Sequence, residues 1–194
     1  LQPCASASIR ACTVLAAAFS RGSATLQRAF DAVSDAGLGL GGPILNLSVL
    51  LSDVSDEVRT AAVDAMQVAL TVATKAQRAA IVELGIVESI CTMLKESISI
   101  NATAAMEESA AALLALAAEG SYNVKTSIAK AGAINLLMTL LTNATTEKGA
   151  SNASGALAAL SEKNADNLKS VAHALNTAIS VRSQPAKAVR LLSA

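Results

Sequence analysis

The sequence predicts an all-α protein built as a solenoid of helical repeats, and three observations support this. Hydrophobic residues make up 53% of the 194 residues and aromatic residues only 2%, so the core must consist of Ala, Leu, Ile and Val. Alanine is the best helix former, and the prolines stand at Pro3, Pro43 and Pro185 only. Apolar residues also recur at helical spacing, and similar segments follow one another at a regular distance. Stacked helical repeats account for all three features.

The clearest unit is the stretch 123–141, NVKTSIAKAGAINLLMTLL. Two apolar stripes at helical spacing flank Gly132, namely Val124, Ile128 and Ala131 before it and Ile134, Leu137, Met138 and Leu141 after it. Glycine adopts the left-handed backbone conformation without a Cβ penalty, so it commonly ends one helix and turns the chain. We therefore expect a short helix, a corner with positive φ at Gly132, and a longer helix.

Residues 1–22 are predicted to form the helix of a partial first repeat. Within 5–19, one face carries Ile9, Cys12, Leu15 and Phe19. An organellar transit peptide is the alternative, because residues 1–30 contain arginines and no acid and are rich in Ser and Ala. The chain begins with Leu, from which we expect a fragment or a processed product.

Residues 23–74 are predicted to be the first full repeat. Its first stripe, Leu26, Phe30 and Val33, ends at a corner at Gly37, and a loop over 39–43 follows. The second helix carries Ile44, Leu47, Leu50 and Leu51. Ser55 or Asp53 caps the third helix, which carries Val58, Ala62, Ala65, Met66, Ala69 and Val72.

Two more repeats are predicted at 75–120 and 121–162, with third helices near 103–118 and 149–161. The corner glycines Gly37, Gly85 and Gly132 are 48 and 47 residues apart, close to the roughly 40–47 residues of three-helix repeats. Residues 163–194 form a partial last repeat, whose stripe after Asn164 has no corner glycine. Pro185 then allows a short helix over 186–192.

Composition and charge exclude several classes of function. Fifteen basic and fifteen acidic residues cancel, which argues against nucleic acid as a partner. No apolar run approaches the roughly 18 residues of a membrane span, so we expect no membrane insertion. Cys4, Cys12 and Cys91 lack metal-site spacing and are interpreted as free core thiols in a reducing compartment. An intracellular, cytoplasmic location follows, with an organelle as the alternative after removal of a targeting segment.

No set of residues has the pattern of an active site, and we expect no enzyme, cofactor or metal. His173 is the only histidine and is expected at an exposed helix edge. Glu107 and Glu108 are adjacent on a helix and so point apart, which favours a solvated or groove-lining role. The glycine-rich stretch 39–43 lacks the strand and the Lys-Ser/Thr of a phosphate-binding loop.

The repeats resemble the armadillo repeat family over about residues 23–180. The features that carry the resemblance are Asn123 nine residues before Gly132, the run AGAINLLMTLL, and an A-L-x-x-L core in two third helices, at 112–116 and 156–160. The stretch EKGASNASGALAALSEKNADN, residues 147–167, is also similar to the repeats beside U-box domains in plant-type ubiquitin ligases. The resemblance implies a right-handed α-solenoid of about three repeats with partial ends.

The resemblance also implies a concave groove lined by the third helices. Its candidate residues are Asp64, Val68, Glu108, Ala111, Ala115, Glu119, Asn152, Gly155 and Ala159. Importin-α-like and β-catenin-like members hold peptides there with a ladder of asparagines and tryptophans. The matching asparagine positions are Val14, Val68, Ala115 and Ala159, and the matching tryptophan positions are Arg10, Asp64, Ala111 and Gly155. Since no amide or indole is present at these positions, a peptide clamp is not expected.

Three hypotheses of function remain at this point. The first is a non-enzymatic protein–protein interaction scaffold or structural subunit of a larger assembly, held by an apolar side or end. The second is the substrate-recognition region of a ubiquitin ligase whose catalytic domain is absent from this sequence. The third, disfavoured by the missing ladder, is a peptide-binding transport receptor. All three make other proteins the partners.

Overall fold

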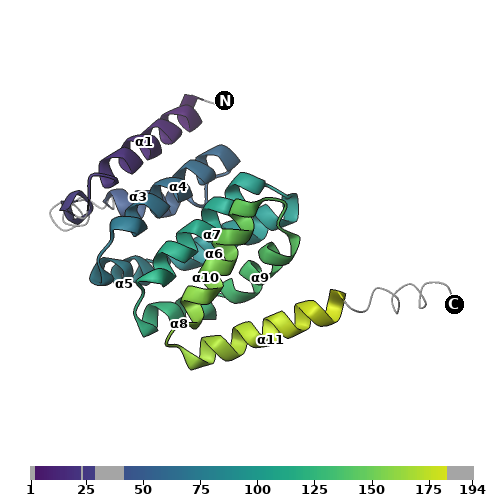
Figure 1. Ribbon diagram of the computed structural model, residues 1–194. Helices are drawn as coiled ribbons and strands as arrows, with labels where there is room; N and C mark the ends of the chain where they lie inside the picture. The colour runs from purple at the N-terminus through teal and green to yellow at the C-terminus, as the bar shows by residue number, and fades with distance from the viewer. Residues whose placement is uncertain (1–2, 23, 29–41, 183–194) are drawn as a thin grey trace.

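The structure is a computed structural model that describes residues 3–22, 24–28 and 42–182 (Figure 1). Within these ranges all of the regular structure is helical, and no strand occurs. The helices whose bounds are described in full are α1 (Pro3–Phe19), α3 (Pro43–Leu50), α4 (Asp56–Val72), α5 (Lys75–Glu83), α6 (Ile86–Ile100), α7 (Thr103–Ala118), α8 (Tyr122–Lys130), α9 (Ala133–Asn143), α10 (Glu147–Ser161) and α11 (Ala165–Arg182), and residues 24–28 are helical as well.

Four helices, α1, α4, α7 and α10, pack one against the next and form an inner layer. We call them the inner helices. The others cover one side of this layer, and α11 packs against α9 and α10 at the far end. Figure 1 shows α1 and α11 at opposite ends of the stack. One continuous hydrophobic core runs through the layers, and Leu113 and Leu116 of α7 are fully buried in it.

The predicted helices agree with the structure to within a few residues. The helix predicted at 103–118 has these bounds, α1 begins at Pro3, and α10 begins at Glu147. Ser55 caps α4, since its hydroxyl accepts a hydrogen bond from the Val58 N–H, while the Asp53 carboxylate accepts one from the Ser55 N–H. The corner at Gly37, most of the loop at 39–43 and the helix at 186–192 lie outside the described residues.

The expected corners at Gly85 and Gly132 are confirmed. Gly85 has φ 73° and Gly132 has φ 86°, both in the left-handed region. At Gly132 the chain turns by 71° between α8 and α9. A side chain at this φ is strained, so glycine is what allows two helices to meet so closely in sequence.

Among the described helices, no single one combines the length and apolar composition that crossing a membrane requires. Only the bent pair α8–α9 meets these criteria, and it does so when its two helices are counted together.

Candidate interaction surfaces

The structure distributes the predicted groove residues along α4, α7 and α10, but several of them are used in contacts between these helices. Ala111 is only 8% exposed. A Cβ at Gly155 would lie 3.3 Å from Cδ2 of Leu114 on α7, and the Asn152 amide donates a hydrogen bond to the Glu107 carbonyl at 3.1 Å. Asn152 and Gly155 therefore contact the neighbouring inner helix α7, and Ala111 is largely buried.

The other predicted positions remain accessible to different degrees. Val68, Ala115 and Ala159 are half-buried and pack on the edge of the core, whereas Asp64 and Glu119 are exposed. Glu108 is half-buried, because it is engaged by a basic side chain from the next inner helix. The accessible part of the predicted surface thus combines small apolar side chains with the carboxylates of Asp64, Glu108 and Glu119.

Lys148 of α10 bridges both glutamates of α7. Its Nζ lies 2.7 Å from Oε1 of Glu108 and 3.5 Å from Oε2 of Glu107. The Thr146 hydroxyl, which caps α10, donates a hydrogen bond to Oε1 of Glu107 at 2.5 Å. Glu107 and Glu108 are therefore fixed in an interhelical network and are not simply solvated. The sequence analysis missed Lys148, although its distance from Glu108 is close to one repeat, which brings equivalent helices side by side.

The electrostatics of this network follow from burial and proximity. Partial burial, and then the nearby charge of Glu108, raise the pKa of Asp64 on α4. The hydrogen bond to Glu108 raises the pKa of Lys148. The acidic groups of the inner surface are thus partly neutralised within the protein itself, which weakens the surface as a site for basic ligands.

A polar recess of about 330 Å³ lies at the edge where the inner helices end. Its lining residues are Lys75, Ala118, Glu119, Gly120, Lys125, Glu162 and Lys163. Lys125 is only 6% exposed, and its Nζ donates to the Glu162 carbonyl at 3.1 Å. Lys125 thereby connects α8 to the end of α10.

Arg78 holds the position in α5 that Lys125 holds in α8. Each is the fourth residue after a capping side chain, Thr74 or Ser121. Arg78 is 5% exposed and donates to the Leu70 carbonyl at 2.9 Å. The sequence analysis missed both of these buried cations, although their equal distance from a Ser/Thr cap was a usable signal.

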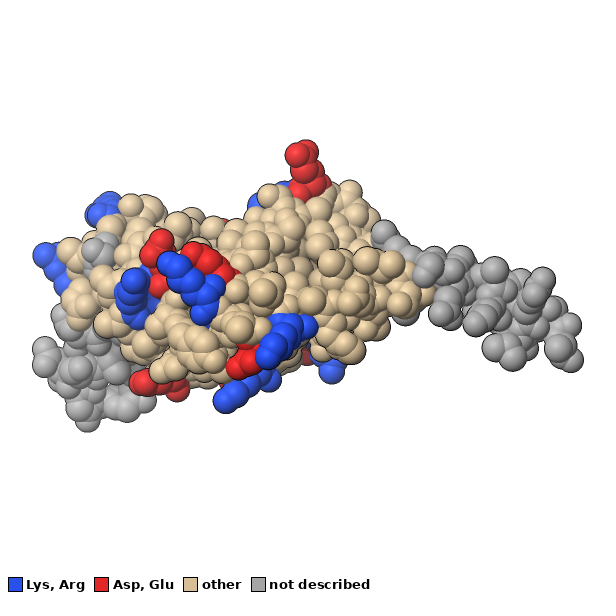
Figure 2. Space-filling view, turned by 60° about the horizontal axis from the view of Figure 1, so that its bottom comes forward, with Lys and Arg blue, Asp and Glu red and all other residues tan. Residues whose placement is uncertain are grey.

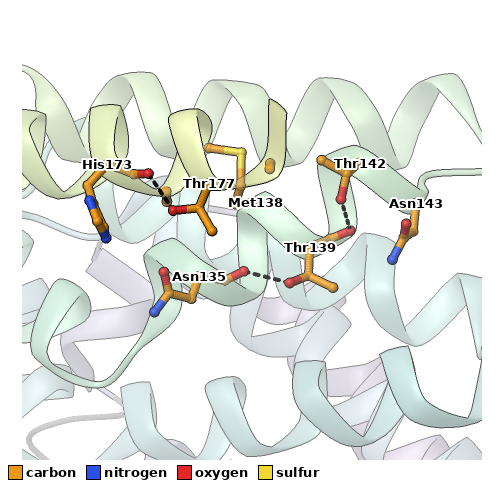
Figure 3. A pocket seen from close by; sticks show the side chains of 9 residues that line it. Asn135, Met138, Thr139, Thr142, Asn143, His173 and Thr177 are labelled. Carbon is orange, nitrogen blue, oxygen red and sulfur yellow. Dashed lines mark hydrogen bonds between the residues drawn. The ribbon is translucent and has the colours of Figure 1, made fainter. Parts of the chain in front are cut away.

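A groove of about 610 Å³ separates α9 from α11 on the outer side (Figure 3). Its walls are formed by Asn135, Met138, Thr139, Thr142, Asn143, His173, Ala174, Thr177 and Ala178. The Thr139 hydroxyl donates to the Asn135 carbonyl, and the Thr177 hydroxyl donates to the His173 carbonyl, so each is bonded within its own helix. His173 is exposed at the rim, as the sequence predicts.

Cys12 and Cys91 are free and buried, as predicted. Burial, with a smaller contribution from the charge of Glu88, raises the pKa of Cys91 to about 12, which leaves its thiol unreactive at neutral pH. In the part of the chain that the structure describes, no three His, Cys, Asp or Glu side chains lie together as a metal site would require.

Both ends of the stack expose large apolar side chains. On α11, Leu168 is 55%, Leu175 45% and Ile179 56% exposed, and Ala172 lies between them on the same stripe. At the other end, Val14 of α1 is 67% exposed. Figure 2 shows a face on which charged side chains gather in a few groups, with broad uncharged areas between them.

Comparison with known proteins identifies the architecture. Neither a protein-family model nor a curated protein sequence matches the chain. Among solved structures, it is similar to a designed armadillo repeat protein with a TM-score of 0.74 and 23% identity, over 86% of this chain and 63% of the designed one. A second designed armadillo repeat protein, solved in complex with the peptide (KR)4, gives a TM-score of 0.72 and 21% identity, over 84% and 62% of the two chains.

A third neighbour, a computationally designed armadillo repeat protein for modular peptide recognition, has a TM-score of 0.69 and 23% identity, over 82% of this chain and 60% of its own. The chain thus spans less than two thirds of the length of these structures. The stacked inner helices, the left-handed glycine corners and these neighbours agree. The protein has the armadillo-type α-solenoid fold.

Proposed function

We propose that this protein is a non-enzymatic interaction scaffold that works as a subunit of a larger protein assembly. The observation that carries the proposal is the exposed apolar stripe of α11, formed by Leu168, Ala172, Leu175 and Ile179. Their spacing of four, three and four residues places them on one side of the helix. A continuous apolar helix face that is left uncovered marks a surface for a protein partner.

The other end of the solenoid supports the same proposal. Solenoids need polar outer faces on their terminal repeats to remain soluble alone. At the α1–α3 side of the described residues, Val14 and Val49 are each about two-thirds exposed. Each end therefore gains stability when a partner covers it, at about 25 cal/mol per Å² of apolar surface removed from water.

The use of the charged groups supports a role without catalysis. Lys148 is engaged by Glu107 and Glu108, and Lys125 by the end of α10. In each case, opposite charges from different helices hold the layers in register. The ubiquitin-ligase hypothesis depends on the sequence resemblance of residues 147–167, and the full reading frame around this chain would decide it.

A dye that binds apolar surface tests the proposal. The 194-residue chain at low concentration should bind the dye and enhance its fluorescence. A double substitution, Leu175→Glu with Ile179→Glu, should lower that signal while circular dichroism remains helical. Ile100→Glu, at a side chain that is equally exposed but lies at the end of α6, serves as the matched control. A chain that stays monomeric at high concentration and binds no dye would overturn the proposal.

A further inference from the structure

We infer that the groove between α9 and α11 binds an extended, uncharged segment of another polypeptide through the main chain of that segment (Figure 3). This site goes beyond the proposed assembly function, because it lies on a different side of α11. Thr177 in the groove is two residues from both Leu175 and Ile179 of the apolar stripe, which is about 200° around a helix. The two surfaces can therefore be tested separately.

The lining of the groove favours a ligand without charge. Among the described residues that form its walls there is no Lys, Arg, Asp or Glu, and His173 is the one side chain that titrates near neutral pH. A phosphate, a carboxylate or an ammonium group would lose water there without gaining an opposite charge, and this transfer costs free energy. The same lining residues include no aromatic side chain on which a nucleobase could stack. A ligand of this groove is therefore held by hydrogen bonds and small apolar contacts.

The polar groups of the walls provide both donors and acceptors. The hydroxyls of Thr139 and Thr177 donate to main-chain carbonyls of their own helices at 2.9 Å and 3.0 Å, so their oxygens interact with a ligand as acceptors. The side-chain amides of Asn135 and Asn143 form no hydrogen bond with another described residue, and each offers two N–H donors and a carbonyl acceptor. The peptide group, with one donor and one acceptor, is the matching partner.

The positions of the two amides fit an extended chain. Asn135 and Asn143 are eight residues apart on α9, which is about 12 Å at a rise of 1.5 Å per residue. An extended chain advances about 3.3 Å per residue, so roughly three to four residues span this distance. Figure 3 shows Asn135 and His173 toward one end of the groove and Asn143 toward the other. A helical ligand would not use these amides, because its main-chain groups are already paired and it docks through an apolar face.

The buried part of the lining accommodates the side chains of such a segment. Met138 and Ala174 are only 6% and 9% exposed, and Ala178 packs against the core. Successive side chains of an extended chain point to opposite faces, so every second one would face this apolar floor. Two alanines and an adaptable methionine leave room for small apolar side chains. We therefore expect a preference for Ala or Val at alternate positions of the ligand.

Peptide binding to the 194-residue chain and two variants tests the inference. The probes are end-blocked peptides of about ten residues without charge, in which Ala or Val alternates with Ser, Thr or Asn. The unmodified chain should bind members of this set, and Asn135→Leu with Asn143→Leu should weaken that binding at least about tenfold. Asn176→Leu, at an exposed position of α11 outside the lining, is the matched control and should bind like the unmodified chain. All three asparagines are exposed, so circular dichroism should remain helical in both variants.

Two further measurements identify the site and the groups that bind. In NMR spectra, the side-chain NH₂ signals of Asn135 and Asn143 should shift when the peptide is added, whereas that of Asn176 should not. Methylation of alternate main-chain nitrogens removes donors from the same peptide and keeps its side chains, and it should weaken binding at least about tenfold.

The inference fails if none of the probe peptides binds, or if binding survives the double substitution in α9. Binding that is lost with Asn135→Leu and Asn143→Leu but is unaffected by methylation would also overturn it, because the main chain would then not be the ligand. Leu175→Glu with Ile179→Glu should leave peptide binding unchanged while it lowers the dye signal. The failure of one proposal is therefore distinguishable from the failure of the other.

Discussion

Helices α8–α9 and helix α11 begin with a similar sequence pattern, but the first segment forms two helices and the second forms one. Ser121 caps α8 and Asn164 caps the first turn of α11. Eleven residues after the cap stand Gly132 in the first case and Leu175 in the second. The chain turns by 71° at Gly132, whereas α11 continues through Leu175 as one helix, Ala165–Arg182.

The difference shows how much of a repeat depends on one backbone conformation. A left-handed residue costs L-amino acids roughly 1–2 kcal/mol, and glycine does not incur this cost. With leucine at the corner position, continuing the helix costs less than turning. The straight helix packs against α9 and α10, and its stripe with Leu168, Leu175 and Ile179 is exposed.

The largest expected effect is a difference in the free energy of unfolding between a substitution in the buried core and one on the exposed stripe of α11. Leu113→Ala should lower the free energy of unfolding by about 2–5 kcal/mol, through lost contacts and a cavity in the core. Leu175→Ala should change it by less than about 1 kcal/mol, because nearly half of its side chain is already in water. Urea denaturation of both variants provides the measurement, and equal losses would contradict the distinction.

The corner itself is tested by one pair of substitutions at equivalent positions. Gly132→Val should cost about 1–3 kcal/mol from backbone strain alone, since a Cβ there would meet nothing within 4 Å. Leu175→Val should cost only about 0.5 kcal/mol through helix propensity. Gly132→Asn should cost less than valine, because asparagine tolerates the left-handed region, as Asn101 does here at φ 60°. A harmless valine at 132 would show that strain does not fix the corner.

Thiol labelling should show that the end layers open more readily than the interior. Cys12 of α1 and Cys91 of α6 are both buried. In native buffer, with Cys4→Ser to simplify the analysis, Cys12 should react with a thiol reagent at least about tenfold faster, because terminal layers open locally at lower free energy. Mass spectrometry of labelled peptides follows each site. Equal rates would mean that the solenoid opens only as a whole.

The smallest expected effect concerns charge on the inner surface. The pKa of Asp64 is raised in the folded protein by burial and by Glu108, so its ionisation opposes folding. This cost is present at pH 7 and disappears as the pH falls below the ordinary value of 3.8. Asp64→Asn should therefore stabilise the protein at pH 7 by at most about 0.5 kcal/mol, with no gain at pH 3. Thermal unfolding at the two pH values would detect the change, and a gain that persists at pH 3 would assign it to another cause.

Much of this fold was predictable from local sequence signals. The glycines Gly85 and Gly132, the caps at Thr74 and Ser121, and the apolar spacing of 103–118 each act over one or two helical turns. The sequence also indicated, through the absent glycine, that the last repeat would differ. The sequence did not show which apolar side of α11 would be buried and which exposed, because this depends on the side that α9 and α10 cover.

The candidate surface was less predictable, because it depends on contacts between layers. Ala111 and Gly155 were predicted to line the groove; Ala111 is largely buried, and Gly155 lies against Leu114 of the neighbouring inner helix. Lys148 forms ion pairs with Glu107 and Glu108, which lie about 40 residues earlier in the sequence. A lysine or a glutamate alone does not indicate which distant residue it will pair with. A composition in which small residues serve both as contact surface and as groove lining does not distinguish the two roles.

The stacking of inner helices also determines how the molecule responds to force. Each inner helix contacts mainly the one before and the one after it, so a load applied to the two ends is carried through the layers in series. The weakest interface then yields first, and the extension should rise in steps of one layer instead of in a single rupture. Since α11 is packed on one side only, a pulling experiment should detach it before the layers joined by Lys148 and Lys125 separate.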